Sequence, residues 1–492
     1  MAQIDPAEMV ANAGKYQDLD GEPWNGLFVR SQVQVTFDSP QATGHRMTPF
    51  EVAEAFGTAS LAKIVEDGGL SIVRSPDEPA RTLKAQRNTL GLTVEEVARE
   101  CGIPKPAVVA AETAGKLNPV RTLERLAQQV GLNEHRIGLG QELGDARELG
   151  ARLKRRLSRP GRSSTRRRDP QDEAGAALTP ITVLRLAEAA WVIARQAELE
   201  ELLPIELRVE PMAKPRTEPL FPGAAWRQGY ELAGRARDLF GLDGEEPIPS
   251  LRSLLDERNG IPLLALLMNE NVAGATLANG RHRGIVVNSS GLNENVWIRR
   301  TTAAHELCHF LWDLDENLDR LRVDTYEDVL AVASRSSSSG VDRIEQRANA
   351  FAVEFLAPRR GIVRLVQSAV TREEALSLIS QNYGISISAA SNHLDNSNHG
   401  NPKLYGEAHL SIQPSDEWRA SEDFGLDFFP MRSCPYARRG RFAQLAARAV
   451  GAGRLTADSG ALLLAVPIEE FQKGFDGLRE LDLRWGEQPS GA

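Results

Sequence analysis

The stretch from Arg299 to Asp313 contains an H-E-x-x-H motif formed by His305, Glu306 and His309. On a helix, residues four apart lie on the same face, one turn from each other. Two imidazoles placed in this way can bind one metal ion from the same side. Glu306, about 100° round the helix from His305, can hydrogen-bond a water molecule beside that ion. The motif therefore predicts a helix that carries part of a zinc-peptidase type of metal site.

The composition predicts a multidomain cytoplasmic protein. With 492 residues the chain is long enough for two to four domains, and 41% hydrophobic and 25% charged residues are typical of globular proteins. The longest apolar runs, such as Ala461–Val466, are too short to span a membrane, and the first residues do not resemble a signal peptide. The three cysteines, Cys101, Cys308 and Cys434, indicate a reducing compartment without a disulfide framework.

Charge is distributed unevenly. The stretch Arg152–Arg168 holds nine Lys or Arg residues and no acid, so the other 49 of the 58 basic residues face 67 acidic ones. We predict a basic linker over residues 150–175. Arg155, Arg156, Arg166, Arg167 and Arg168 are candidate contacts to DNA phosphates, which would give salt-sensitive affinity. A solvated hinge explains the same composition equally well.

The first 80 residues form a region of unknown role. Gly26–Asp38 alternates in polarity as a strand does, and Thr48-Pro49 is typical of a helix start, with Thr as N-cap.

The sequence of residues 81–140 predicts a small all-α domain. Apolar residues recur at helical spacing between Gly91, Gly102 and Gly115, and Thr93 with Glu96 forms a capping box. This helix-turn-helix pattern resembles the Xre-type (Cro/C1) DNA-binding domain over about fifty residues, including an E-x-x-G-K-x-N-P tail at Glu112–Pro119.

The expected reading helix of this domain departs from the Xre-type pattern. Its sequence, K-P-A-V-V-A-A, offers Lys105 but none of the Arg, Asn or Gln residues that read bases directly. Lys105 and Lys116 are candidate DNA contacts. A packing or dimerisation module is the alternative.

The sequence predicts that residues 176–400 form the domain that contains the H-E-x-x-H helix. Helices from Thr179 to Leu203 and from Ala224 to Leu239 lead into it. Three strands follow, at Ile261–Met268, Ala273–Ala278 and Gly284–Asn288, and the last two are joined by a turn at Asn279-Gly280. A small sheet followed by an H-E-x-x-H helix is typical of zincin-like metallopeptidases.

A catalytic zinc site with two histidines needs a third protein ligand. Asp315 is a candidate by position, although Trp312 stands where a glycine would turn the chain back toward the metal. Glu345 begins the helical segment Asp342–Pro358 and borders its apolar stripe, so its carboxylate can reach a metal held by the neighbouring helix. Glu354, the remaining candidate, lies on the outward side of the same helix.

Two further residues near the predicted ligands could each have one of two roles. Asn349, one turn after Glu345, either hydrogen-bonds that carboxylate or lies on the surface. We expect Cys308 to be a small buried residue and not a fourth metal ligand.

These motifs resemble the ImmA/IrrE family of metallopeptidases over residues 224–396. The resemblance rests on G-A-T-L at Gly274–Leu277, T-x-A-H-E-x-x-H at Thr302–His309 and E-x-x-A-N-x-F-A-x-x-F-L-x-P at Glu345–Pro358. It implies one Zn²⁺ per chain with His305, His309 and Glu345 as ligands and Glu306 as general base. It also implies a protein substrate, namely a transcriptional repressor cleaved in a stress or prophage response. Tyr326, His282 and Tyr383 are candidate proton donors in that reaction.

The predicted architecture is therefore multidomain α+β: a helix-turn-helix domain, a basic linker, a zincin-like domain and a helical accessory region at residues 401–492. The predicted partners are a protein substrate, double-stranded DNA and a second copy of the chain, with no membrane. The alternative function is a helix-turn-helix transcriptional regulator whose zinc domain binds a partner or senses a signal without proteolysis.

Overall fold

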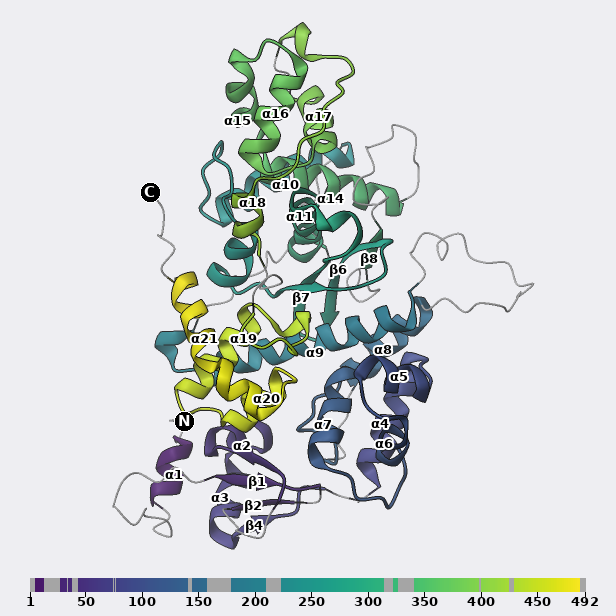
Figure 1. The fold of residues 1–492 in the computed structure, drawn as a ribbon, viewed down its shortest axis with the longest axis vertical. Coiled ribbons are helices and arrows are strands. Elements are labelled where there is room, and N and C mark those ends of the chain that lie inside the picture. Colours follow the sequence, from purple (N-terminus) through teal and green to yellow (C-terminus); the bar gives the residue numbers. More distant parts are fainter. Residues whose placement is uncertain are drawn as a thin grey trace, which may run out of the picture. The chain divides into compact units, whose positions relative to one another are not determined.

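The computed structural model describes residues 5–12, 27–32, 34–37, 43–73, 75, 77–139, 144–156, 178–208, 223–313, 322–325, 340–397, 400–423 and 429–486 (Figure 1). Contacts between Cα atoms divide the chain into two compact units. Unit 1 comprises Met1–Leu157, Pro180–Val209 and Gly425–Ala492, and unit 2 comprises Ser158–Thr179 and Glu210–Phe424. The described part of the chain is mostly helical, with two small sheets.

The N-terminal part of unit 1 contains an antiparallel sheet and three helices. The strands are β1 (Phe28–Arg30), β2 (Val35–Phe37), β3 (His45–Met47) and β4 (Gly69–Leu70), in the order β3-β1-β2-β4. The helices are α1 (Pro6–Asn12), α2 (Pro49–Phe56) and α3 (Thr58–Asp67). We expected a single strand over Gly26–Asp38, but the backbone bonds between Ser31 and Gln34 reverse the chain and make a hairpin of it.

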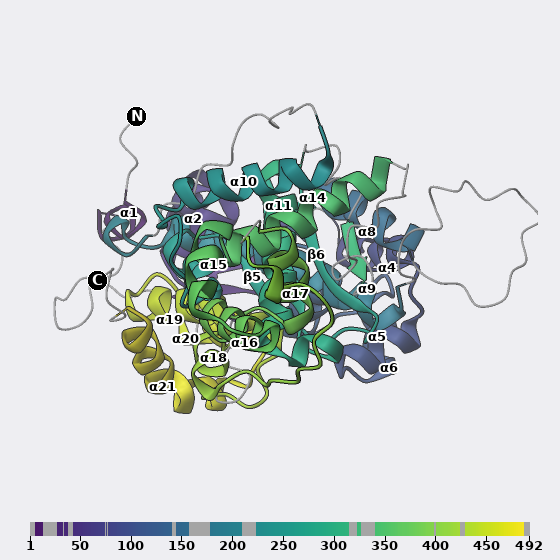
Figure 2. The same ribbon diagram turned by 90° about the horizontal axis from the view of Figure 1, so that it is seen from above.

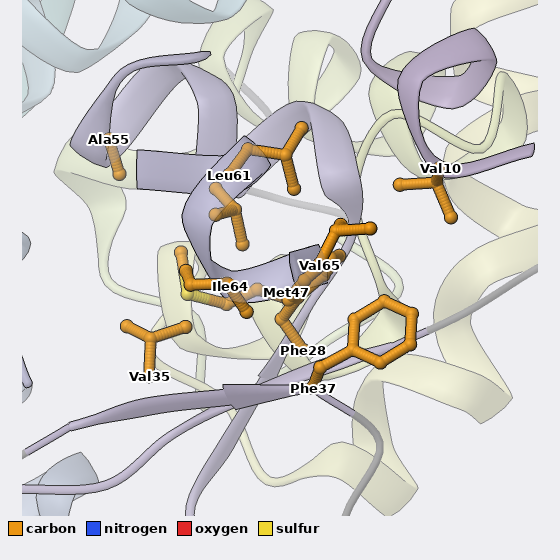
Figure 3. Close-up of a cluster of buried hydrophobic side chains, with 10 residues drawn as sticks. Val10, Phe28, Val35, Phe37, Met47, Ala55, Leu61, Ile64 and Val65 are labelled. Atoms are coloured by element: carbon orange, nitrogen blue, oxygen red, sulfur yellow. The ribbon is translucent and has the colours of Figure 1, made fainter. Parts of the chain in front are cut away.

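The core of this sheet follows from its register. Phe28 is paired with Phe37 on one side and with Met47 on the other, so three large apolar side chains meet on one face. Apolar residues of α1, α2 and α3 cover that face (Figure 3): Val10, Val52, Ala55, Leu61, Ile64 and Val65.

Two predicted helix starts are confirmed. The Thr48 side chain accepts a hydrogen bond from the Glu51 amide while the Glu51 carboxylate accepts one from the Thr48 amide, and Thr93 and Glu96 do the same. These reciprocal bonds satisfy amide groups that the first helical turn leaves without partners.

The segment predicted as a helix-turn-helix domain is helical. It contains α4 (Glu78–Leu90), α5 (Val94–Cys101), α6 (Lys105–Ala111) and α7 (Val120–Gln129). Gly102 ends α5 in the left-handed conformation, with φ of 61°, which favours glycine and allows the tight turn into α6. A paired contact between the Arg87 guanidinium and the Glu112 carboxylate, at 2.7 and 2.8 Å, joins α4 to the end of α6.

The remaining helices of unit 1 come from distant parts of the sequence. They are α8 (Gly144–Arg156), α9 (Pro180–Leu202), α19 (Arg441–Gly451), α20 (Ala457–Leu463) and α21 (Ile468–Gly486). Arg438 and Glu188, both fully buried, form an ion pair at 2.8 Å that joins the C-terminal part to α9. Helix α9 and the residues after 424 thus belong to the same compact unit as the N-terminal part.

Unit 2 contains the predicted strands, in a sheet of order β5-β7-β6-β8. The strands are β5 (Leu263–Leu266), β6 (Val272–Asn279), β7 (His282–Asn288) and β8 (Arg322–Thr325). β6 and β7 pair in antiparallel register with Asn279 opposite His282, which confirms the predicted hairpin. β5 is parallel to β7 and β8 is antiparallel to β6.

The helices of unit 2 are α10 (Ala225–Leu239), α11 (Val296–Trp312), α14 (Gly340–Leu356), α15 (Arg359–Leu365), α16 (Arg372–Tyr383), α17 (Ile387–Asp395) and α18 (Asp416–Ser421). A short π-helical segment, Ser253–Arg258, precedes β5. α11 packs against β6 and β7, and α14 lies between α11 and α10 (Figure 2).

Gly229 allows the close packing of α10 against α14. A Cβ at this position would lie 2.3 Å from the Arg347 carbonyl oxygen and 2.8 Å from the Phe351 amide nitrogen, both backbone atoms that cannot turn away. We expect Gly229→Ala to lower the free energy of unfolding of unit 2 by about 1–3 kcal/mol, measured by denaturant titration. Gly234 is the matched control, because it lies on the same helix with no atom within 4 Å of its Cβ position. Gly234→Ala should stabilise by about 0.5–1 kcal/mol, and equal effects of the two changes would contradict this account.

Across the described ranges, no helix combines the length and the apolar character needed to cross a membrane.

Candidate metal centre

Three side chains from two helices converge in unit 2. His305 and His309 lie on α11, and Glu345 lies on α14. The two Nε2 atoms are 3.0 Å apart, and Glu345 Oε2 lies 3.2 Å from Nε2 of His305 and 3.6 Å from Nε2 of His309. Both histidine side chains are fully buried, while that of Glu345 is 13% exposed. The helical spacing of four residues thus places both imidazoles on the face of α11 that meets α14.

The outer nitrogens of both rings are engaged by oxygen atoms. His305 Nδ1 donates to Asn349 Oδ1 at 2.8 Å, and His309 Nδ1 donates to Asp313 Oδ2 at 3.0 Å. Arg347 donates to the other oxygen of Asp313. Because each Nδ1 carries the hydrogen, each neutral ring presents the lone pair of Nε2 to the other ligand atoms.

The converging atoms fit a metal ion. Lone pairs and a carboxylate oxygen that face one another at 3.0–3.6 Å repel unless a cation lies between them. In a tetrahedral zinc site with bonds of about 2.0–2.1 Å, ligand atoms are separated by roughly 3.3 Å, which is close to the three distances observed. Two imidazole nitrogens and one carboxylate are also a donor set that zinc accepts. Within the part of the chain that the structure describes, this is the one group of three such residues with ligand atoms within 4.8 Å.

Glu306 is held by the neighbouring strand β6. Its side chain is completely buried, and its Oε2 accepts a hydrogen bond from the Thr276 hydroxyl at 2.7 Å. Gly274, on the same strand, gives the carboxylate room, because a Cβ there would lie 2.9 Å from Glu306 Oε1. The strand therefore both orients the carboxylate and leaves space around it.

Helix α11 is anchored to the sheet, to the segment before β5 and to the residue that follows α18. Asn293 donates to the carbonyls of Ala273 and Asn288, both at 2.9 Å, and accepts from Thr302 at 3.0 Å. Arg300, which is buried, donates to the Ile248 carbonyl at 2.8 Å and to the Glu422 carboxylate. These bonds fix the helix that carries both histidines.

Sequence reasoning missed several residues of this site. Asp313, Arg347 and Thr276 have no spacing signal, because their roles depend on which elements meet in space. Asn349, which was expected either to hydrogen-bond Glu345 or to lie on the surface, accepts a hydrogen bond from His305 Nδ1. Glu354, which we expected on the outward side, is instead paired with Arg359 at 3.0 Å and with His393 at 3.3 Å.

The other residues singled out from the sequence do not join the cluster within the described residues. Cys308 is buried, as predicted. The Tyr383 hydroxyl donates to the Glu245 carbonyl at 2.9 Å, and burial raises its pKa to about 12. His282 lies at the hairpin end of β7. Asp315 and Tyr326 lie outside the described residues.

The structure describes only some of the predicted DNA contacts, and the prediction stays a prediction. Lys105, at the start of α6, is paired with Glu95 of α5, and Lys116 is exposed in the turn before α7. Arg155 and Arg156 end α8. Arg166, Arg167 and Arg168 lie outside the described residues.

Asp313→Asn is expected to weaken zinc binding by roughly 10- to 100-fold, the usual effect of losing an outer partner of a metal-bound histidine. The neutral amide accepts a weaker hydrogen bond from His309 Nδ1, and Arg347 loses its charged partner. Competition with a chromophoric chelator measures the affinity. Asp416→Asn, at a side chain that is 97% exposed, is the control. Equal affinity in Asp313→Asn and the unmodified chain would contradict this role.

A comparison with known families matches the part of the chain that carries these converging side chains. Among curated proteins, no sequence matches this chain. The family model described as the IrrE N-terminal-like domain (Peptidase_M78) matches residues 256–395. The match begins after α10, later than residue 224, where we placed the start of the resemblance. Because the matched range contains His305, Glu306, His309 and Glu345, residues 256–395 form an IrrE N-terminal-like domain with a candidate metallopeptidase centre.

Proposed function

We propose that this protein is a zinc-dependent endopeptidase that cleaves a transcriptional regulator. The observation that carries the proposal is the convergence of His305, His309 and Glu345, together with the buried carboxylate of Glu306, which follows His305 in α11. A structural zinc site closed by four protein ligands needs no such carboxylate, whereas a hydrolytic site needs a base next to an open coordination position.

The residues of the chain account for the proton transfers of peptide hydrolysis. Zinc, when bound by His305, His309 and Glu345, supplies Lewis-acid polarisation of the scissile carbonyl. Glu306 takes a proton from the attacking water and gives it to the leaving amine. The Thr276 hydroxyl donates to one oxygen of this carboxylate at 2.7 Å and so orients it. Asn349 and Asp313 keep the two imidazoles oriented throughout the cycle.

The identity of the substrate rests on the resemblance of the chain to ImmA/IrrE peptidases paired with Xre-type domains. Helices α4–α7 with the tight turn at Gly102 support an Xre-like domain in the same chain. The face of α6 does not favour base readout, because its exposed residues are Lys105, Pro106 and Val109. Of these, Lys105 is already paired with Glu95. We propose that any contact with DNA is made to phosphates. Retention of duplex DNA at low salt that falls as salt rises supports this contact, and no retention at low salt excludes it.

A cleavage assay tests the proposed function. The purified chain is incubated with the purified regulator encoded beside its gene, before and after removal of metal with a chelator. We expect cleavage that stops on chelation and returns with zinc but not with magnesium. A regulator that stays intact under all conditions, yet copurifies with the chain, would instead support the non-proteolytic alternative.

A further inference from the structure

Four buried polar side chains from distant parts of unit 1 form a linear cluster. They are Glu51 of α2, Ser459 of α20, His45 of β3 and Glu124 of α7, here called the His45 cluster. Ser459 Oγ contacts the Glu51 carboxylate and lies 2.7 Å from His45 Nε2. On the other side of the ring, His45 Nδ1 lies 3.1 Å from the Glu124 carboxylate. Each of the four residues is at most 3% exposed, so the contacts depend on the hydrogens that these side chains hold themselves.

The cluster contains three contacts, and each needs a hydrogen atom between its two polar atoms. Ionised carboxylates supply no hydrogen, the Ser459 hydroxyl supplies one, and the neutral ring of His45 supplies one. Two hydrogens cannot fill three contacts, and a contact without a hydrogen places two lone pairs against each other in a buried site. The cluster is therefore complete only when it holds one proton more than ionised carboxylates and a neutral imidazole provide.

The additional proton has two places in the cluster. On His45 it makes an imidazolium ion that donates to both Glu124 and Ser459, while Ser459 donates to Glu51. On Glu51 it makes a carboxyl group that donates to Ser459, while Ser459 donates to the neutral ring of His45. Both arrangements fill all three contacts with the same atoms, so His45 and Glu51 titrate as a coupled pair.

The charges in the cluster favour retention of this proton. Arg30 lies 3.3 Å from Glu124 and balances that carboxylate. Among the described residues, no Lys or Arg forms an ion pair with Glu51, which accepts hydrogen bonds from backbone amides and from Ser459. Burial opposes the charged form of His45, but the neighbouring carboxylates outweigh burial and raise its pKa. Burial also raises the pKa of Glu51, against the lowering effect of His45 and Ser459.

The other charged groups near the cluster are engaged with one another. Asp458, beside Ser459 on α20, is paired with Arg121. In the turn after α7, Glu134 lies 3.4 Å from the Arg195 guanidinium. The ring of His135 stacks on that of His45 with centroids 6.4 Å apart, and burial holds the pKa of His135 well below its usual value, so this ring is neutral.

We propose that the His45 cluster is a proton-operated latch within unit 1. With the additional proton, all three contacts are filled and β3, α7 and α20 are held together. When the proton leaves, two acceptors face each other in one contact, and the three segments separate more easily. Because the folded state binds the proton more tightly than the unfolded state, stabilisation by the latch is complete below about pH 6.5, the ordinary pKa of histidine. It is lost as the pH rises through the value of the folded state.

Hydrogen–deuterium exchange of the full chain, followed in peptides that contain β3 and α20, tests the latch. Rates are measured between about pH 6 and pH 9 and corrected for the intrinsic pH dependence of amide exchange. We expect protection of these peptides to fall as the pH rises, by up to about tenfold per pH unit, the slope for loss of one proton. Peptides from α16, in unit 2, are the internal reference and should keep their protection.

Glu51→Gln separates the latch from an ordinary buried contact. The glutamine amide donates to Ser459, Ser459 then donates to neutral His45, and His45 donates to Glu124, so all three contacts are filled without an additional proton. Glutamine also keeps the capping box with Thr48. We expect protection of β3 and α20 in this variant to stay high at pH 9. Glu148→Gln, at an exposed glutamate of α8, is the matched control and should respond to pH as the unmodified chain does.

Two further variants assign the proton. Ser459→Ala removes two of the three contacts and should give low protection that no longer depends on pH. Glu54, on the same helix as Glu51, is 30% exposed, and burial raises its pKa to about 7, so Glu54→Gln removes its separate contribution. The pH dependence should persist in Glu54→Gln. Protection that does not change with pH in the unmodified chain, that falls equally in Glu51→Gln, or that loses its pH dependence in Glu54→Gln would overturn the proposal.

Discussion

Replacing Glu306 with glutamine is expected to lower the rate of peptide cleavage by about 100- to 10,000-fold, the range usually lost with a general base. Glutamine has nearly the shape of glutamate and can keep the contact with Thr276, but it cannot accept a proton from water. Because Glu306 is not among the three converging ligand atoms, zinc should remain at one equivalent per chain. Cleavage of the regulator and elemental analysis of the same sample measure the two effects.

The control for this change is Glu294→Gln, at an exposed glutamate just before α11. It removes a negative charge near the same helix and should leave cleavage unchanged. A Glu306→Gln enzyme that cleaves at the normal rate would remove Glu306 as the base. Loss of zinc together with activity would show instead that Glu306 supports the fold of the site.

Glu345→Ala is expected to remove zinc from the chain under conditions in which the unmodified protein retains one equivalent. Two imidazoles alone leave the site without its negatively charged ligand. The loss of affinity should therefore exceed the roughly 10- to 100-fold expected for an outer partner such as Asp313. Elemental analysis after gel filtration, with chelator competition for the residual affinity, measures the effect.

Glu354→Gln distinguishes the loss of a zinc ligand from a general loss of negative charge. Glu354 lies on the same helix as Glu345 and pairs with Arg359 and His393. Zinc content should be unchanged in this variant. One equivalent of zinc retained by Glu345→Ala would remove Glu345 from the ligand set.

Much of the metal site could be predicted because its spacing is local. His305 and His309 are one turn apart on any helix, and the apolar stripe of the segment after Asp342 indicates which side of Glu345 faces inward. The strands were also readable, because the alternation of β6 and β7 and the turn at Gly280 are local signals. The partners of the histidines could not be predicted, since the positions of Asp313 and Arg347 depend on how α11 and α14 pack.

The polar core of unit 1 could not be predicted from local sequence either. Its polar core is assembled from Glu51, Glu134, Arg195 and Ser459, which come from the N-terminal part, the turn after α7, α9 and α20. A buried charge in any one of these segments appears unfavourable when its own stretch of sequence is considered alone. Each is accommodated only when the others are present, so periodicity in one stretch cannot predict the group.

The interleaving of the two units has a consequence for synthesis on the ribosome. The buried pair Glu188–Arg438 joins parts of unit 1 that are separated by the whole of the IrrE N-terminal-like domain. Domains generally fold as units while the chain is being made. The peptidase-type unit can therefore complete its fold while unit 1 still lacks α19, α20 and α21. Until those last helices emerge, the nascent chain carries a folded unit 2 and an incomplete unit 1 that chaperones and proteases can recognise.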